Sequence, residues 1–260
     1  MADYGHVFRA ISDFILQLLL AIEGVLRGAP WWAIILVFVG LAYWGSRRVG
    51  MSLMVGGLMF AVGMLGLWDQ TMQTLALMLM ATLLSIVIGV PIGILTAKFK
   101  TMRMITLPVL DVMQTMPSFV YLIPALMLFG LGKVPAVLAT IIYSVPPLIR
   151  LTDLGIRQVN REVVEAVTAF GGSPTRILFK TELPLALPTI MAGLNQTIMM
   201  ALSMVVVASM IGARGLGETV LNGIQTLDVG KGLEAGLGIV ILAVVLDRIT
   251  QSFGKTQGGE

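Results

Sequence analysis

The 260-residue sequence contains no cysteine and only one histidine, His6. Without cysteine, the chain can form no disulfide, no thiolate metal site and no cysteine nucleophile. A single histidine excludes a multi-histidine metal site and a Ser-His-Asp triad built within the chain. We therefore predict no catalytic residue and no metal site.

Charge is also scarce. Charged residues make up 12% of the chain and hydrophobic residues 57%, whereas soluble domains carry about 25% charged residues. So little charge cannot cover a water-facing surface of this size, and the apolar stretches are long and repeated. We predict an all-α, polytopic membrane protein, because helices satisfy their own backbone groups in lipid. The net charge of +3 then indicates basic cytoplasmic loops and no nucleic-acid partner.

Seven apolar stretches are predicted to cross the membrane, and tryptophans mark the ends of the first two. Trp31, Trp32 and Trp44 flank the first stretch, and Trp68 ends the second, as aromatic residues do at membrane interfaces. The seven predicted spans are residues 30–46, 50–67, 72–97, 104–130, 134–151, 188–211 and 233–250.

The segment before the first span has a different pattern. In residues 11–27, polar residues such as Asp13 and Gln17 recur at helical spacing against apolar ones, and the apolar run that ends at Glu23 is too short to cross a bilayer. We predict an amphipathic helix that lies in the membrane interface. The alternative is a short extra span.

The distribution of basic residues predicts the orientation. Twelve of the 17 lysines and arginines fall in loops on one side of the predicted spans, and the positive-inside rule assigns that side to the cytoplasm. The N-terminus is then outside and the C-terminus inside. Loop 152–187 is cytoplasmic and loop 212–232 is external. The twelve residues are Arg47, Arg48, Lys98, Lys100, Arg103, Arg150, Arg157, Arg161, Arg176, Lys180, Arg248 and Lys255.

Polar residues inside spans four to six are candidates for the lining of a passage. Intramembrane polar groups are costly, so they face a cavity or another helix, and prolines that kink helices expose carbonyls to such a cavity. For any one residue, an interhelical hydrogen bond remains the alternative. The candidate passage residues are Gln114, Pro117, Tyr121, Tyr143, Asn195, Gln196, Met199 and Ser203. We expect Asp111, nearby, to pair with Arg103 or Arg150 or to close an inner gate.

Loop 152–187 is the most informative segment. Residues 161–170 are predicted to form a helix that Gly171 and Gly172 end. Ser173 and Pro174 are predicted to open a second helix, with serine as its N-cap, and Leu183-Pro184 to end it before the sixth span. The amphipathic second helix leaves Ile177, Leu178 and Phe179 available for contact, and an exposed apolar patch marks a partner site.

This loop resembles the EAA loop of permease subunits in binding-protein-dependent ABC importers. The matching residues are Glu165, Ala166, Gly171, Leu183 and Pro184. Five other strings are similar to the glycine betaine/proline branch of that family, and the resemblance covers roughly residues 70–252. These strings are residues 111–124, 144–152, 187–197, 210–217 and 246–250.

The resemblance implies a type I importer half for glycine betaine or proline betaine in osmoprotection, placed in the bacterial inner membrane. Two copies would form a homodimer, two cytoplasmic ATPase subunits would bind ATP and magnesium, and an external binding protein would deliver the solute. This chain would bind no cofactor, and membrane lipid would surround it. The residues implied in ATPase coupling are Glu165, Ala166, Phe170, Gly171, Arg176, Leu183 and Pro184.

The hydropathy pattern of the first 70 residues and the resemblance over the rest divide the chain into four parts. Residues 1–29 form a tail and interfacial helix, 30–69 two peripheral spans, 70–252 the permease core with coupling loop 152–187, and 253–260 a cytoplasmic tail. Two other functions stay open as alternatives: an ion-coupled secondary transporter and a membrane-embedded lipid-modifying enzyme.

Two glycine-rich strings resemble nucleotide-binding motifs without their context. Gly254-Lys255-Thr256 looks like the end of a P-loop, but Ile249 stands where the earlier glycine is required. Gly212, Gly215 and Gly217 follow a membrane span and have no βαβ unit around them. We expect the second string to act as a flexible external gate or a receptor contact.

Overall fold

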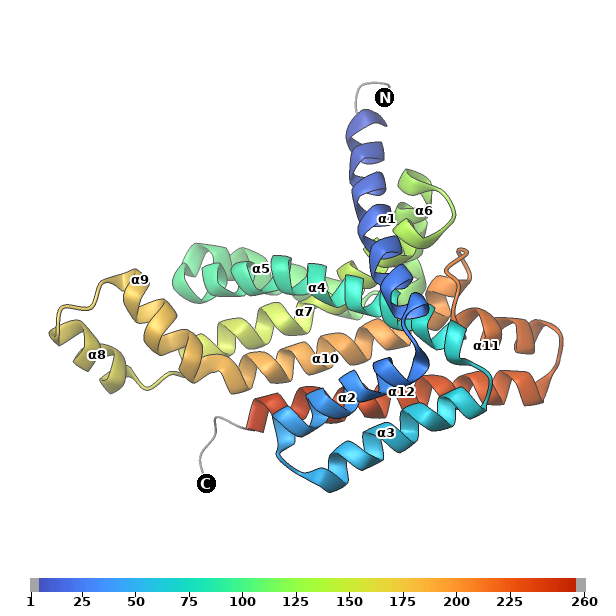
Figure 1. Ribbon diagram of the computed structural model, residues 1–260. Helices are drawn as coiled ribbons and strands as arrows, with labels where there is room; N and C mark the ends of the chain where they lie inside the picture. The colour runs from blue at the N-terminus through green and yellow to red at the C-terminus, as the bar shows by residue number, and fades with distance from the viewer. Residues whose placement is uncertain (1–4, 256–260) are drawn as a thin grey trace.

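The computed structural model describes residues 5–255, which contain helices and no strand (Figure 1). Side chains are described for residues 9–254, so His6 and Thr256 lie outside this account. The elements are α1 (Gly5–Gly28), α2 (Trp31–Ser46), α3 (Val49–Met64), α4 (Trp68–Lys98), α5 (Lys100–Thr115), η1 (Ser118–Tyr121), α6 (Leu122–Phe129), α7 (Lys133–Arg157), α8 (Arg161–Ala169), α9 (Pro174–Ile177), η2 (Leu178–Glu182), α10 (Leu183–Ser209), α11 (Leu216–Gln225) and α12 (Val229–Lys255).

Small residues allow α4, α7 and α10 to pack closely at the centre of the bundle. A Cβ added at Gly93 of α4 would lie 2.5 Å from Thr152 Cβ of α7. A Cβ added at Gly193 of α10 would lie 2.9 Å from Leu151 Cβ, also on α7. Close approach of backbones is how membrane helices gain packing contacts, because lipid supplies no hydrophobic force between them.

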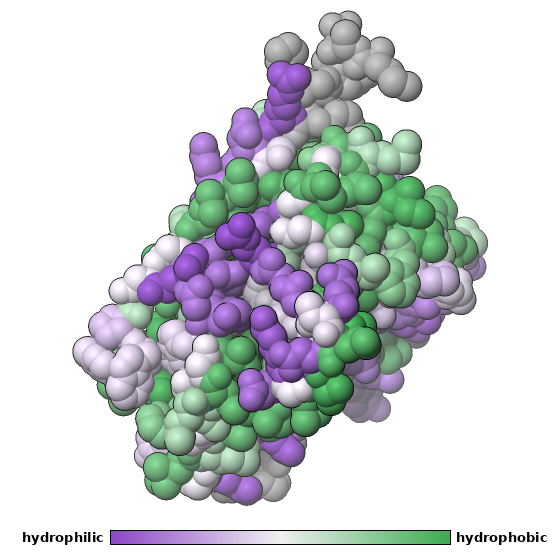
Figure 2. All heavy atoms as spheres, turned by 90° about the vertical axis from the view of Figure 1, so that its right-hand side faces the viewer, coloured by the Kyte–Doolittle hydropathy of each residue, from purple (hydrophilic) through white to green (hydrophobic). Residues whose placement is uncertain are grey.

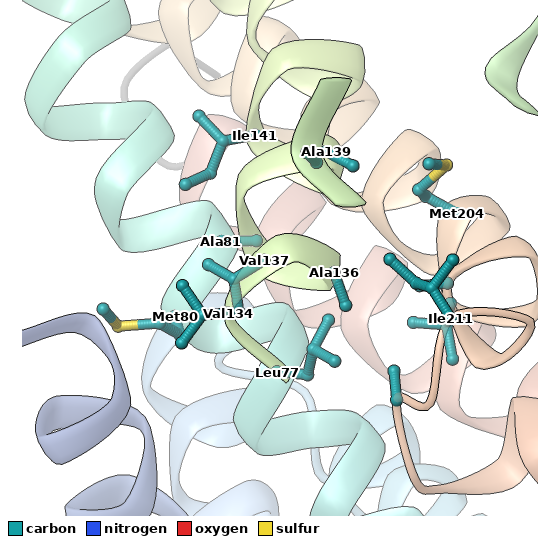
Figure 3. Close-up of a cluster of buried hydrophobic side chains, with 14 of the residues drawn as sticks. Leu77, Met80, Ala81, Val134, Ala136, Val137, Ala139, Ile141, Met204 and Ile211 are labelled. Atoms are coloured by element: carbon teal, nitrogen blue, oxygen red, sulfur yellow. The ribbon is translucent and has the colours of Figure 1, made fainter. Parts of the chain in front are cut away.

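Buried apolar side chains fill the space between these helices. Leu77 and Met80 of α4 belong to one buried cluster with Val137 of α7 (Figure 3). The same cluster continues to Met204 of α10 and to Ile211, which follows it. This core holds α4, α7 and α10 as one body, from which the connecting segments project.

The membrane-spanning architecture is confirmed, with fewer uninterrupted spans than the seven predicted. Four helices of the described chain are long and apolar enough to cross a membrane: α4, α7, α12 and the continuous helix Pro174–Ser209. Counting each bent helix pair as one span gives up to six. α2 and α3 have only 16 residues each, which is shorter than the ~20 residues that cross a bilayer without thinning it.

The predicted span 104–130 is not one helix. α5 ends at Thr115, and the η1–α6 segment leaves at an angle of 110°. Met116 is extended, with φ −73° and ψ 135°, because the ring of Pro117 disfavours the helical conformation of the residue before it. Proline thus breaks this segment rather than merely kinking it.

The helix predicted over residues 11–27 extends over Gly5–Gly28 and turns 105° away from α2. It stands across the direction of the long helices (Figure 1), the orientation expected of a helix in the plane of the membrane. Its buried Glu23 contacts Lys133 of α7 at 2.5 Å, and Arg27 contacts Asp69 of α4 at 2.6 Å. These ion pairs fix α1 on the starts of α4 and α7.

Loop 212–232 begins with the glycine string Gly212–Gly217, for which an external gate or a receptor contact stays a prediction. It contains α11, whose buried Leu216 packs in the core beside α12. Leu216 N–H donates to Thr74 Oγ1 at 2.9 Å, and the left-handed Gly215, with φ 137°, brings the chain against α4. Figure 2 shows that polar residues gather on this end of the molecule, with apolar residues around them.

Candidate coupling site and membrane passage

The predicted helix–turn–helix in loop 152–187 is confirmed. Asn160 Oδ1 accepts a hydrogen bond from Glu162 N–H at 2.9 Å and caps α8. Gly171 has φ +80°, and Gly172 N–H donates to Val167 O at 3.0 Å, which closes the helix as a left-handed glycine does. Ser173 Oγ then accepts from Arg176 N–H and caps α9.

The hairpin projects from the bundle, and its tip is open to contact (Figure 1). Phe170 is 93% exposed, and Ala166 and Arg176 are also exposed. Glu165 accepts from Arg161 Nε at 2.8 Å, with both side chains largely in solvent. An almost fully exposed phenylalanine at the tip of a projecting hairpin is consistent with a surface that a partner covers.

One part of the predicted contact patch is wrong. Ile177 is buried and Leu178 is half-buried, and only Phe179 is exposed. Ile177 closes the hairpin from inside, because a Cβ on Gly172 would meet its side chain at 3.3 Å. The short α9 thus uses its apolar residue to hold the turn, which leaves Phe170 and Phe179 for a partner.

Leu183-Pro184 does not end the second helix, contrary to the prediction. The chain remains helical from Pro174 to Ser209, because the π-helical turn Leu178–Glu182 leads directly into α10. Proline is tolerated at the start of α10, since the wider turn accommodates its missing donor. Leu183 packs partly against the core and Pro184 is exposed, so the hairpin is rigidly continuous with a membrane helix.

One ion pair ties the base of the hairpin to the core, and another set joins α5 and α7. Buried Glu182 on η2 forms an ion pair with Lys98 at the end of α4. Asp153, buried on α7, lies 3.5 Å from both Arg103 of α5 and Arg157 of its own helix. α7 runs to Arg157, past the predicted span end at residue 151. A movement of the hairpin base would act on α4 through the Glu182–Lys98 pair.

Asp111 forms an ion pair with Arg150, one of its two expected partners, with 2.6 Å between Asp111 Oδ1 and Arg150 Nη2. Arg103 pairs with Asp153 instead. The Asp111–Arg150 pair is exposed, so it lies on a face of the chain that the bundle itself does not cover.

The candidate passage residues fall into two groups. Tyr121 of η1 and Tyr143 of α7 lie with ring centroids 6.0 Å apart, and the Tyr121 hydroxyl donates to Met113 O of α5. Pro117 lies at the break between α5 and η1, and Gln114 is exposed on α5. The interruption of the predicted fourth span thus brings the two tyrosines together.

The second group of candidate residues lies along α10. Gln196 and Ser203 are exposed, Met199 is half-buried, and Ser203 Oγ donates to Met199 O at 3.0 Å. Asn195 instead faces α12, where its Nδ2 donates to Asp247 Oδ1 at 2.9 Å.

Asp247 and Gln251 were missed as site candidates. Gln251 Nε2 also donates to Asp247 Oδ1, at 2.8 Å. Asn195, Gln196 and Gln251 line a hollow of ≈ 360 Å³ between α10 and α12. A carboxylate inside an apolar stretch was the signal that could have found this cluster.

Residues 89–256 match the family described as binding-protein-dependent transport system inner membrane component. The chain belongs to this family. The predicted resemblance is confirmed, and the protein is an ABC importer permease, a transport subunit rather than an enzyme. Neither the secondary transporter nor the lipid-modifying enzyme is favoured. Family membership implies a partner ATPase, on which ATP and magnesium act, and a substrate-binding partner, and the permease is a multi-pass inner-membrane protein.

Known relatives cover most of the permease. The glycine betaine/proline betaine transport system permease protein ProW of Escherichia coli is 51% identical over 98% of this chain and 72% of its own length. The glycine betaine transport system permease protein OpuAB of Bacillus subtilis is 47% identical, with 96% and 88% covered. The glycine betaine/carnitine transport permease protein GbuB of Listeria monocytogenes is also 47% identical, with 100% and 93% covered.

The fold of the permease is also found among solved structures. A chain of the MetNI methionine ABC transporter, in an inward-facing conformation, matches with a TM-score of 0.64 at 20% sequence identity. The match covers 74% of the permease and 96% of that chain, so the similarity supports the permease fold alone.

Proposed function

We propose that two copies of this permease form the membrane passage of an ATP-driven importer for glycine betaine-type compatible solutes. The observation that carries the proposal is the exposed α8–α9 hairpin, whose Phe170 is 93% exposed and whose second helix continues into α10. A separate ATPase would dock on the hairpin, and an external binding protein on the opposite, polar end.

The solute class follows from the relatives. Those at 47% to 52% identity are named for glycine betaine, with proline betaine or carnitine in some names. Trimethylamine N-oxide permeases are 38% identical and a choline permease 32%. All these solutes are small and carry a methylated ammonium or amine oxide group, and glycine betaine is the one that the most similar relatives share.

A homodimer gives the exposed polar groups of α5 and α10 a role. Gln114 and Gln196 are exposed on apolar helices, where contact with lipid costs of order 2–7 kcal/mol for each unsatisfied polar group. Facing a second copy across a water-filled passage removes that cost. The adjoining Tyr121–Tyr143 pair offers aromatic faces that attract a quaternary ammonium.

The geometry also supports a coupling route. Closure of two ATPases on ATP would push the α8–α9 hairpins of the dimer. Because η2 is continuous with α10 and Glu182 pairs with Lys98, that displacement would reach α10 and α4 together. ATP binding would thus bias the permease between two arrangements, as a ligand biases any two-state unit.

Uptake by the complete importer tests this function. The permease is reconstituted in liposomes with its ATPase and binding protein, and ATP-dependent entry of radiolabelled glycine betaine is measured. Phe170→Ala is expected to reduce both co-purification of the ATPase and uptake at least tenfold. Phe14→Ala, at a residue 63% exposed on α1, is the matched control and should leave both unchanged. ATP-independent uptake by the permease alone would refute the proposal.

The proposed orientation has its own test, because the chain has no native cysteine. Ser173→Cys in the hairpin and Asn222→Cys on α11 introduce single thiols at exposed positions. In intact cells, a membrane-impermeant maleimide should label the α11 thiol and reach the hairpin thiol only after permeabilisation. Labelling of the hairpin in intact cells would reverse the orientation.

A further inference from the structure

A pocket of ≈ 370 Å³ lies between the α2–α3 turn and the end of α12. Arg47 and Arg48 line it from the turn, and Arg248 lines it from α12. The α2–α3 turn and the end of α12 lie at the same end of the bundle as the α8–α9 hairpin (Figure 1). The function proposed above uses none of these three residues.

Among the described side chains, no carboxylate forms an ion pair with the three guanidinium groups. None of the ion pairs among residues 9–254 includes Arg47, Arg48 or Arg248. Asp247 adjoins Arg248 in sequence, but its carboxylate accepts from Asn195 and Gln251 on the side of α10. Three like charges around one pocket repel each other, so an anion that enters gains from all three.

The backbone of the turn adds to the attraction. Arg48 is the N-cap of α3 and makes no side-chain cap, so the first N–H groups of this 16-residue helix have no side-chain acceptor at the cap. A helix N-terminus favours negative charge. Arg47 has φ +54°, where glycine is less strained than any residue with a Cβ. The α2–α3 turn therefore carries the Arg47 guanidinium at a backbone position where glycine would be less strained.

Close packing of α2 on α12 brings the three arginines together. A Cβ added at Gly45 would lie 2.0 Å from Ser252 Oγ, so only glycine allows this approach. Ser252 lies one helical turn after Arg248 on α12. The contact therefore sets Arg248 against the α2–α3 turn.

Aromatic residues next in sequence to the pocket lining indicate the depth of lipid headgroups. Trp44 of α2 is 68% exposed and makes an edge-to-face contact with Phe253 of α12, with ring centroids 6.0 Å apart. Exposed tryptophan at the end of a membrane helix is typical of the interface. Leu41 of α2 and Leu53 of α3 are also exposed. They offer apolar surface that the acyl chains of a bound lipid could contact.

We propose that this pocket binds the phosphodiester headgroup of an anionic membrane phospholipid. Guanidinium groups bind phosphate oxygens in pairs of parallel hydrogen bonds, and basic pockets between membrane helices on the cytoplasmic side suit such headgroups. Binding would tie α2 and α3, which are short for the bilayer, to α12 and the core.

Lipid titration of the purified full-length chain in detergent, followed by native mass spectrometry, tests the site. The wild type should retain dioleoylphosphatidylglycerol in preference to dioleoylphosphatidylcholine. The triple variant Arg47→Gln, Arg48→Gln, Arg248→Gln should bind phosphatidylglycerol about a hundredfold more weakly, since each basic group near an anionic surface contributes roughly fivefold. Replacement of the same three residues by lysine should keep the fold and give intermediate binding.

The matched control removes three exposed charges away from the pocket: Arg9→Gln, Arg214→Gln and Lys231→Gln. It should bind phosphatidylglycerol like the wild type. Equal binding by the control and the pocket variant would overturn the proposal. So would full displacement of the lipid by millimolar inorganic phosphate, which would make this a free-phosphate site, or unchanged lipid binding with loss of ATPase co-purification, which would make it a protein contact.

Discussion

Lys98 at the end of α4 forms an ion pair with Glu182 on the π-helical turn that carries the α8–α9 hairpin. Glu182 is 7% exposed, so its charge is compensated by a partner from another helix rather than by water. This contact makes the hairpin base part of the membrane core. Glu165, by contrast, pairs only within α8 and in solvent.

Glu182→Gln and Glu165→Gln should therefore have different effects. Glu182→Gln leaves Lys98 without its partner and should lower the free energy of unfolding by about 1–3 kcal/mol. Glu165→Gln removes an exposed i,i+4 pair worth about 0.5 kcal/mol or less, yet it should impair ATPase docking. Thermal unfolding in detergent and ATPase co-purification are measured side by side. Equal destabilisation by the two variants would contradict the assignment of Glu182 to the base.

Gly171→Leu should uncouple transport although the space around this residue is open. Its φ is +80° and no atom lies within 4 Å of a Cβ added there, so the cost is one of backbone strain, about 1–2 kcal/mol. The hairpin would relax to another turn and displace Phe170. ATP-dependent uptake should fall several-fold, with Gly171→Asn less affected because asparagine tolerates this conformation.

Gly66→Leu is the control for Gly171→Leu. Gly66 has φ +70° and the same open surroundings, but it lies in the turn between α3 and α4. Figure 1 shows this turn at the opposite end of the bundle from the hairpin. The strain is matched and the proposed role is absent, so uptake should stay near the wild-type rate. Similar losses in both variants would show that strain alone, and not coupling, explains the effect.

Gly93→Ala should destabilise the core. The new Cβ would lie 2.5 Å from Thr152 Cβ and 2.9 Å from Ile149 O, and a backbone carbonyl cannot move without shifting α7. Overpacking of this kind costs about 1–3 kcal/mol. Gly40→Ala on α2 meets nothing within 4 Å and should be neutral. The unfolding temperature in detergent distinguishes them, and an unchanged value for Gly93→Ala would indicate a looser packing of α4 on α7.

Asn195→Asp should disrupt the contact between α10 and α12. Asn195 Nδ2 now donates a hydrogen bond to Asp247 Oδ1 at 2.9 Å. The substitution replaces this donor by a second carboxylate, and two carboxylates at this distance repel each other. We expect a loss of about 1–3 kcal/mol of stability and lower uptake. Gln196→Glu adds the same charge on the exposed face of α10 and should cost much less stability.

The double variant Asn195→Asp, Asp247→Asn exchanges the two groups and restores one carboxylate and one amide. It should recover most of the stability and much of the uptake that Asn195→Asp loses. Recovery of stability without uptake would mean that the position of the charge on α12, and not only the contact, is needed for transport.

The hairpin could be predicted from sequence almost completely, because its signals are local. Gly171 supplies the left-handed turn, and Ser173 and Pro174 supply the start of α9, whatever the rest of the chain does. The ends of the neighbouring helices were less predictable. Leu183-Pro184 looked like a helix end, but the π-turn before it absorbs the proline.

The amino-acid sequence by itself determined that this protein is helical, membrane-spanning and equipped with a projecting loop, because hydropathy, proline and glycine act over a few neighbouring residues. The tertiary structure alone decided which charged and polar groups meet: Lys98 with Glu182, Asn195 with Asp247, and three arginines from two distant segments around one pocket. Such partners lie on different helices. Their meeting depends on how small residues let those helices approach and rotate, which no single segment specifies.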